Sequence, residues 1–223
     1  MKNLIVIGAW GSGKTELALH FALKLSESGT RPVSLVDLDI TKPYFRSREL
    51  VETLRTAGIA VLSNSLGYEA DLPALSPAIY GTIEREDPAV FDIGGDESGS
   101  RVLGRFSSFF NQAGYRMLMV INPYRPDSRN ARTIGRLAEK MENKSRLKIH
   151  GLIANPNLGN ETTAGDWLFG RETVFKVAQS MDKPLLYTTV GPGLRDRIRQ
   201  DNYTEELLYL KLMVKPPWEF EGR

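Results

Sequence analysis

Short apolar runs alternate with longer amphipathic stretches from one end of the chain to the other. Apolar runs of this length, bounded by polar or turn-forming residues, indicate strands. Several are apolar at consecutive positions, which is typical of strands that helices cover on both faces. We therefore predict strands at Leu4–Ile7, Val33–Val36, Ile59–Leu62, Val90–Ile93, Met117–Ile121, Leu147–Ala154 and Leu185–Tyr187.

The stretches between these runs have the spacing of amphipathic helices. The predicted helices are Lys14–Ser28, Arg46–Ala57, Leu72–Arg85, Arg101–Gln112, Ser128–Asn143, Asp166–Met181 and Glu205–Val214. Regular alternation of strands and helices favours an α/β fold with three layers, in which helices flank a mainly parallel central sheet. No repeat, low-complexity segment or linker interrupts the pattern, so we expect residues 1–223 to form a single domain.

The last predicted helix is apolar enough to suggest a helix on a membrane surface. It carries Glu205 and Glu206 but only Lys211 as a cation, whereas anionic membranes attract basic helices. We expect this segment to pack on the protein core, and stable membrane binding is not indicated.

The composition is that of an ordinary soluble globular protein. Of 223 residues, 41% are hydrophobic and 25% charged, and 29 lysines and arginines against 27 acids give a net charge of +2. No apolar run approaches the ~20 residues of a membrane span, and the run at Leu4–Ile7 is too short for a signal peptide. We expect a cytoplasmic protein. Nucleic-acid binding is not indicated, because the arginines between Arg125 and Arg136 have the spacing of a solvated helix face.

The chain contains no cysteine and only two histidines, His20 and His150. This excludes disulfides, thiolate nucleophiles, cysteine-ligated zinc and self-supplied iron–sulfur clusters. The chemistry must therefore come from oxygen and nitrogen groups.

Residues 8–15 read GAWGSGKT directly after the first predicted strand, which satisfies the pattern GxxxxGK[ST]. Glycines let such a loop turn its N–H groups around phosphate oxygens, and the next helix points its positive end at them. Lys14 would reach the β- and γ-phosphates, and the Thr15 hydroxyl would bind Mg²⁺. A dinucleotide fingerprint is excluded because its third glycine would fall on Glu16.

Carboxylates follow two of the predicted strands. Asp37 and Asp39 end the second strand, and Asp92 lies at the end of Val90–Ile93. Because parallel strands end at one edge of a sheet, we expect these acids beside the phosphate loop, where Mg²⁺ and the attacking water need them. Gly94 and Gly95 follow and would let the backbone approach a γ-phosphate and rearrange after its loss.

Together these residues resemble the SIMIBI class of P-loop NTPases, in the branch of MinD/ParA and of cobyrinate and dethiobiotin synthetases. The resemblance covers nearly the whole chain, through residues 8–15, 36–39 and 92–95, Asn155 after a late strand, and Gly191. It implies a parallel sheet with ATP and Mg²⁺ bound at its C-terminal edge. The motifs are specific to the class and not to one activity.

The resemblance also implies individual roles. Asp39 would be the switch I acid that positions or activates water, and Asp92 the Walker B acid; the metal set would be Thr15, Asp39 and Asp92, and the catalytic set Lys14, Asp37 and Asp39. Asn155 would contact adenine, and because the guanine motif [NT]KxD is missing, adenine is favoured over guanine. The residues expected to contact the nucleotide are Gly8, Gly11, Ser12, Gly13, Lys14, Thr15, Glu16, Asn155, Pro156, Val190 and Gly191.

One position departs from the MinD/ParA pattern. In that branch a lysine follows the first glycine and reaches the phosphates of a partner in an ATP-dependent dimer, but here the residue is Ala9. Either the chain does not dimerise in that way or another cation substitutes, for which Lys42, Arg46 and Arg48 are the candidates. The alternative is that these three cations simply begin a surface helix.

Three functions remain open. The first is an ATP-dependent switch, a Mg²⁺-dependent ATPase that changes its affinity for a partner protein. The second is a ligase that passes the γ-phosphate to a small carboxylate. Its acceptor pocket would be lined by Tyr68, Glu69, Asp71 and Tyr80, although the same stretch is equally well interpreted as a loop and helix covering the sheet. The third is a kinase that uses Asp39 as base and the Arg125–Arg136 face for phosphate. The absence of cysteine removes the branches of the class that carry iron–sulfur clusters.

Overall fold

The computed structural model describes residues 2–29, 32–39, 48–63, 77–95, 97–128 and 130–213. Eight strands form one sheet in the order β3-β2-β4-β1-β5-β6-β7-β8, and every neighbouring pair is parallel. The strands are β1 (Asn3–Gly8), β2 (Val33–Asp37), β3 (Ile59–Ser63), β4 (Ala89–Asp92), β5 (Arg116–Ile121), β6 (Gly151–Ala154), β7 (Leu185–Val190) and β8 (Glu206–Tyr209). The predicted three-layer α/β fold is therefore confirmed.

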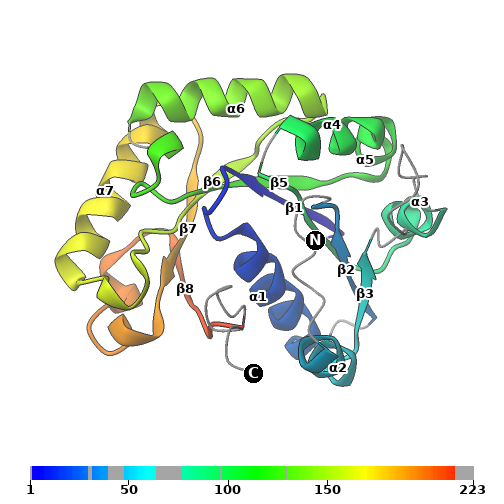
Figure 1. Cartoon of the computed structure of the whole chain (residues 1–223), viewed down its shortest axis with the longest axis horizontal. Coiled ribbons are helices and arrows are strands. Elements are labelled where there is room, and N and C mark those ends of the chain that lie inside the picture. The colour runs from blue at the N-terminus through cyan, green and yellow to red at the C-terminus, as the bar shows by residue number, and fades with distance from the viewer. Residues whose placement is uncertain are drawn as a thin grey trace, which may run out of the picture.

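Helices cover both faces of the sheet (Figure 1). They are α1 (Lys14–Glu27), α2 (Arg48–Thr56), α3 (Pro77–Glu84), α4 (Glu97–Arg105), α5 (Ser107–Ala113), α6 (Ala131–Ser145) and α7 (Ala164–Ser180). Short 3-10 turns lie at η2 (Pro126–Ser128), η3 (Gly159–Glu161), η4 (Pro192–Leu194) and η5 (Gln200–Asn202). Helices α3 to α7 pack on one face, and α1, α2 and the C-terminal segment pack on the other.

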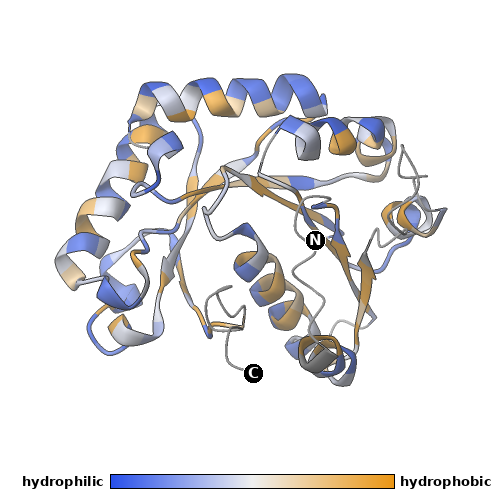
Figure 2. Cartoon of the chain, viewed as in Figure 1, coloured by the Kyte–Doolittle hydropathy of each residue, from blue (hydrophilic) through white to orange (hydrophobic). Residues whose placement is uncertain are grey.

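The central strand β1 shows why the chain builds two apolar layers. Ile5 and Ile7 point into the layer under α3 to α7, whereas Leu4 and Val6 point into the layer over α1. Alternate residues of a strand face opposite sides of the sheet, so a strand between two helical layers is apolar at every position. Figure 2 shows the apolar strands between helices whose outer faces are polar.

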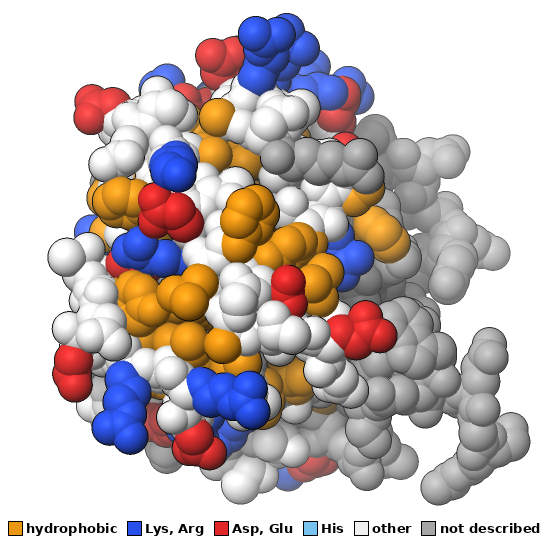
Figure 3. Space-filling view, turned by 90° about the vertical axis from the view of Figure 1, so that its left-hand side faces the viewer, with side chains coloured by type: hydrophobic (Ala, Val, Ile, Leu, Met, Phe, Trp, Pro, Cys, Tyr) orange, Lys and Arg blue, Asp and Glu red, His pale blue; other side chains and the backbone are white. Residues whose placement is uncertain are grey.

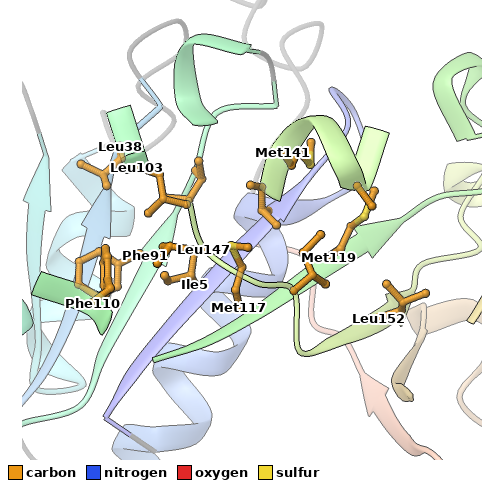
Figure 4. Close-up of a cluster of buried hydrophobic side chains, with 14 of the residues drawn as sticks. Ile5, Leu38, Phe91, Leu103, Phe110, Met117, Met119, Met141, Leu147 and Leu152 are labelled. Carbon is orange, nitrogen blue, oxygen red and sulfur yellow. The ribbon is translucent and has the colours of Figure 1, made fainter. Parts of the chain in front are cut away.

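The first of these layers is drawn in Figure 4. Phe91 of β4 meets Phe110 of α5 edge to face, with ring centroids 5.0 Å apart. Met117 and Met119 of β5 lie in the same layer, fully or almost fully buried. Each such side chain contributes about 1.5–3 kcal/mol through burial, and the layer sets the position of the strand ends that carry the polar residues.

Several predicted boundaries shift, as for β7, which continues to Val190, and α6, which begins at Ala131. In two places apolar side chains belong to non-regular backbone. In the predicted strand Leu147–Ala154, only Gly151–Ala154 forms β6. Leu147 and Ile149 are buried, but the Ile149 N–H bonds the Glu142 carboxylate at 2.8 Å instead of a neighbouring strand. The predicted helix Arg101–Gln112 divides into α4 and α5.

The predicted helix Glu205–Val214 is wrong. Residues Glu206–Tyr209 form the edge strand β8, paired with β7 from Tyr187↔Glu206 to Val190↔Tyr209. A short apolar run does not distinguish a helix from a strand by its period, and here the open edge of β7 decided the structure. The expectation that this segment packs on the core is confirmed, because Leu207, Leu208 and Leu210 are buried.

The edge formed by α7 and β8 carries apolar side chains at the surface, grouped among charged ones (Figure 3). The large apolar residues that are exposed include Leu168 and Phe169 of α7, Leu158 in the preceding loop and Leu212 beyond β8. Among the described residues, no helix combines the length and apolar character that crossing a bilayer requires.

Candidate functional site

The loop between β1 and α1 is folded as a compact cradle at the C-terminal edge of the sheet. Gly13 has a φ of 95°, in the left-handed region that favours glycine. A Cβ at this position would lie 2.3 Å from the Asn155 side-chain nitrogen, so the contact between the loop and the end of β6 also requires glycine. Helix α1 begins at the next residue and points its N-terminus into the loop.

Lys14 lies back over this loop. Its side chain is buried at 7% exposure, and its Nζ donates a 2.9 Å hydrogen bond to the Ala9 carbonyl. Within the loop, the Ser12 hydroxyl is buried and makes no hydrogen bond among the described residues. A buried cation and an unsatisfied hydroxyl in one loop are groups that an anionic ligand can satisfy.

Thr15 and Asp92 join the loop to the neighbouring strand β4. The Thr15 hydroxyl donates a 2.6 Å hydrogen bond to Asp92 Oδ2, while Asp92 Oδ1 is buried and has no partner among the described residues. Asp37 is the register partner of Asp92 across β2 and β4, and both are buried. Asp37 Oδ1 accepts the Asp39 N–H at 2.9 Å, which fixes the chain just beyond the strand.

Burial of these acids changes their titration. Desolvation raises the pKa of Asp37 to about 8, and the neighbouring Asp92 raises it further. Desolvation also raises the pKa of Asp92, to about 6, although the Thr15 hydrogen bond and the charge of Lys14 oppose the shift. The nearby positive charge is therefore too small to keep both carboxylates ionised. A further cation close to them would lower both pKa values and favour the ionised forms.

The donors at this point fit Mg²⁺. The ion prefers oxygen ligands, and commonly takes one or two from the protein and the rest from water and phosphate. The Thr15 hydroxyl and the free Asp92 oxygen are such ligands, and Asp39 lines the same cleft. In the described ranges, no group of three or more His, Cys, Asp or Glu side chains able to hold a metal occurs.

An open cleft of about 270 Å³ runs over the loop. A second cavity of about 130 Å³ adjoins it, and both are lined by Asn155, Asn157 and Gly159. The first also includes Glu16, whose carboxylate accepts the Met213 N–H at 2.6 Å. Through these shared residues the two cavities lie next to each other, between the phosphate loop and the ends of β6 and β7.

Of the residues predicted to hold the base, some line these cavities and one does not. Pro156 and Gly191 line the second cavity. Val190 is buried with Trp167, and its carbonyl accepts the Leu210 N–H at 2.9 Å, so its side chain belongs to the core.

Asn155 links the phosphate loop to the second cavity. Its side-chain nitrogen donates to the Ser12 carbonyl at 2.7 Å, and its oxygen accepts from the Thr189 hydroxyl at 2.6 Å. Asn155 therefore braces the phosphate loop, in addition to lining both cavities.

Gly94 and Gly95 continue the chain from β4 past the loop. A Cβ at Gly95 would lie 2.8 Å from Lys14 Nζ and 2.7 Å from the Trp10 nitrogen, so the Gly95 backbone is in contact with the cradle. A Cβ at Gly99 in α4 would lie 2.4 Å from the Gly94 carbonyl. The glycines thus stand between the phosphate loop and the start of α4.

Other predicted residues cannot be placed at the cleft. Lys42, Arg46, Tyr68, Glu69 and Asp71 lie outside the described residues, as does the side chain of Arg48, the first residue of α2. Tyr80, the fourth residue suggested for an acceptor pocket, packs against the rings of Phe106 and Phe109 in the apolar layer under α3 to α7. It does not line the cleft.

Four residues from the loops after β5 and β6 line the cleft without having been predicted as nucleotide contacts. They are Asn122, Arg125, Asn157 and Gly159. The spacing of Arg125 suggested a helix face, either solvated or, in the kinase alternative, phosphate-binding, but Arg125 precedes α6 and its Nε donates to the Gly11 carbonyl at 3.1 Å. The available signal was its position just beyond the end of a predicted parallel strand.

No protein-family model and no curated protein matches the chain. Solved structures match it in fold. The signal recognition particle receptor FtsY from Elizabethkingia anophelis, in complex with GDP, has a TM-score of 0.54 and 18% identity over 85% of this chain. FtsY from Thermotoga maritima has a TM-score of 0.56 and 19% identity over 85% of this chain. The chain has the P-loop NTPase fold.

The chain spans 57% and 62% of the lengths of these two FtsY chains. A nucleotide-binding protein from Archaeoglobus fulgidus, in complex with ADP, is also similar, with a TM-score of 0.50, 16% identity, and coverage of 84% of this chain and 80% of its own. At these identities the likeness establishes the shared P-loop fold, while the base and the partner must be argued from the residues of this chain.

Proposed function

We propose that the protein binds ATP with Mg²⁺, hydrolyses it, and acts as a nucleotide-driven switch for a partner protein. The observation that carries the proposal is the link between Thr15 and Asp92. It sets a hydroxyl and a buried carboxylate with a free oxygen beside a glycine-rich loop and its lysine. This is the donor set that a Mg²⁺–triphosphate needs.

The residues around this hydrogen bond would bind the phosphates, hold Mg²⁺ and orient the attacking water. Lys14 would exchange its bond to the Ala9 carbonyl for the β- and γ-phosphates. Thr15 and Asp92 would hold Mg²⁺, which supplies charge neutralisation of the phosphates when bound. Asp39 lines the cleft and would orient the attacking water, while Asp37 holds the Asp39 backbone in place.

The switch element would be the chain from Asp92 to α4. Gly95 lies against Lys14 and Trp10, so a γ-phosphate bound at Lys14 would meet the Gly95 backbone first. Gly94 in turn contacts Gly99 of α4. Movement at the phosphate could therefore reach a surface helix through a few residues, as in switches that respond to loss of a γ-phosphate.

ATP is proposed over GTP because the chain lacks the [NT]KxD motif that reads guanine. The fold does not distinguish the two bases, because it is shared by FtsY in complex with GDP and by the Archaeoglobus protein in complex with ADP. Within the SIMIBI class we favour the MinD/ParA-like branch because the motifs at residues 8–15, 36–39 and 92–95 follow one another as they do in that branch. Residue 9 is alanine, so a dimer of this chain would have no lysine to use at that position.

The test measures ATP turnover and mass in solution, with ADP and with a non-hydrolysable ATP analogue, for the wild type and Lys14→Ala. We expect slow hydrolysis, preference for ATP over GTP, a change in assembly or partner binding with the analogue, and loss of all three in the variant. Absence of nucleotide binding by the wild type would refute the proposal. Turnover only with an added carboxylate or hydroxyl acceptor would replace the switch by the ligase or kinase alternative.

A further inference from the structure

We infer that Arg125 is a second cationic contact for the phosphates of the bound nucleotide, supplied from the loop after β5. The inference rests on the proposed nucleotide-binding function. It adds a residue outside the phosphate-loop motif to the part of the site that recognises phosphate.

The backbone of this loop is held firmly. The Arg125 N–H bonds the Asn122 carbonyl at 3.1 Å, and the Ser128 N–H bonds the Arg125 carbonyl at 2.9 Å. Asn122 is buried, accepts the Tyr124 N–H at 3.1 Å, and donates to the Asn157 carbonyl at 2.9 Å. The loop that presents Arg125 is thus tied to itself and to the loop after β6.

The side chain of Arg125 reaches the phosphate loop. Its Nε donates to the Gly11 carbonyl at 3.1 Å, and a Cβ at Gly11 would lie 3.4 Å from this Nε and 3.7 Å from Cδ and Cζ. Gly11 has a φ of 71°, so the turn favours glycine there, and the arginine side chain packs at contact distance from the turn. A guanidinium has five N–H donors, and the terminal nitrogens of Arg125 make no hydrogen bond to any described residue.

The charged side chains that line the cleft are also consistent with a second cation at the phosphates. Its described lining contains two cations, Lys14 and Arg125, and two acids, Glu16 and Asp39. A Mg²⁺–triphosphate remains anionic, and Arg125 is the second cation, beside Lys14, in the described lining. Arginine suits the role because its planar fork donates two parallel hydrogen bonds to phosphate oxygens.

The experiment uses the full chain with Mg²⁺ and two probes, a non-hydrolysable ATP analogue and tripolyphosphate, which has phosphates but no base. Affinities are measured by calorimetry for the wild type, Arg125→Ala, Arg125→Lys and Arg136→Ala. Arg136 is an exposed arginine of α6, so its replacement by alanine is a control with the same change of charge. The melting temperature of each ligand-free variant is measured in parallel.

We expect Arg125→Ala to weaken binding of both probes about tenfold or more, since a hydrogen bond to a charged group is worth about 1.5–3 kcal/mol. Arg125→Lys should recover part of the affinity, and Arg136→Ala should bind as the wild type does. Equal affinities for Arg125→Ala and Arg136→Ala would overturn the contact while leaving the proposed function intact. A fall in ligand-free melting temperature with no rescue by lysine would overturn it in favour of a purely bracing role. Failure of the wild type to bind either probe would overturn the proposed function and the contact together.

Discussion

Asp37 and Asp92 are register partners in the β2–β4 ladder, and both are buried at the end of their strands. The sheet therefore brings together two like-charged groups that are 55 residues apart in sequence (92 − 37). Two carboxylates away from water disfavour their own ionisation. Such an arrangement stabilises the fold poorly at neutral pH, but it matches a site that receives a divalent cation with its nucleotide.

The first prediction concerns pH and stability without ligand. Burial raises the pKa of Asp37 to about 8, whereas an unfolded aspartate titrates near 3.9. The folded state therefore holds a proton that the unfolded state releases, and the free energy of unfolding falls as pH rises from about 4 to about 8. Asp37→Asn removes the titrating group and therefore this loss of stability. At pH 8 the variant should have a free energy of unfolding, measured with urea, at least about 1 kcal/mol higher than that of the wild type.

The control for this prediction is Asp201→Asn, at an exposed carboxylate of η5. It should follow the wild type at every pH. At about pH 3, below both the unfolded and the folded pKa of Asp37, this side chain is largely neutral in both states, and Asp37→Asn and the wild type should converge. A constant difference between the two proteins across the whole range would contradict the prediction, because only a titrating group produces a difference that grows with pH.

Local patterns predicted most of what lies on one continuous stretch of chain. The phosphate loop follows from a motif of eight consecutive residues, and the acids follow from strand ends that meet at one edge of a parallel sheet. The edge strand β8 was missed because Leu207 and Leu208 are compatible with either period, and the open edge of β7 decides between them.

Contacts between distant segments were not visible in the sequence. Arg125 reaches Gly11 across 114 positions, and Asn155 reaches Ser12 across 143. The spacing of Arg125 and its neighbours suggested a helix face, but the structure begins α6 at Ala131. A side chain's partner in another loop depends on how β1, β5 and β6 lie side by side, which no local window contains.

The second prediction concerns the hydroxyl of Thr15. Thr15→Ala removes the donor to Asp92 Oδ2 and the proposed Mg²⁺ ligand together, so turnover should fall at least about a hundredfold. Thr15→Ser keeps the hydroxyl and should retain turnover within a few-fold. Measuring rate against Mg²⁺ concentration tests both, and equal rates for the alanine and serine variants would show that the hydroxyl has no part in the reaction.

The third prediction separates the two hydrogen bonds of Asn155. Asn155→Asp keeps an oxygen that accepts from the Thr189 hydroxyl. It loses the N–H donor to the Ser12 carbonyl, so that a carboxylate oxygen faces this carbonyl oxygen with no hydrogen between them. We expect a loss of unfolding free energy of about 1–3 kcal/mol and weaker nucleotide binding, because an unsatisfied buried group costs that much. Denaturant unfolding and calorimetry measure the two effects. Asn202→Ala, at an exposed position of η5, is the control and should change neither; wild-type values for Asn155→Asp would exclude the brace.

The last prediction uses Trp10 as a reporter. Trp10 is 61% exposed, lines the cleft, and its backbone nitrogen lies beside Gly95. A nucleotide that enters the cleft must change the surroundings of this indole, whereas Trp167 is buried at 1% exposure between α7 and the end of β7. Adding the Mg²⁺–ATP analogue should therefore change the tryptophan emission of the wild type. The third tryptophan of the sequence, Trp218, lies outside the described residues, so the comparison is repeated with Trp218→Phe in both proteins. In that background, Trp10→Phe should bind the analogue in calorimetry with little or no change in emission. An undiminished change in that variant would place the nucleotide away from the phosphate loop.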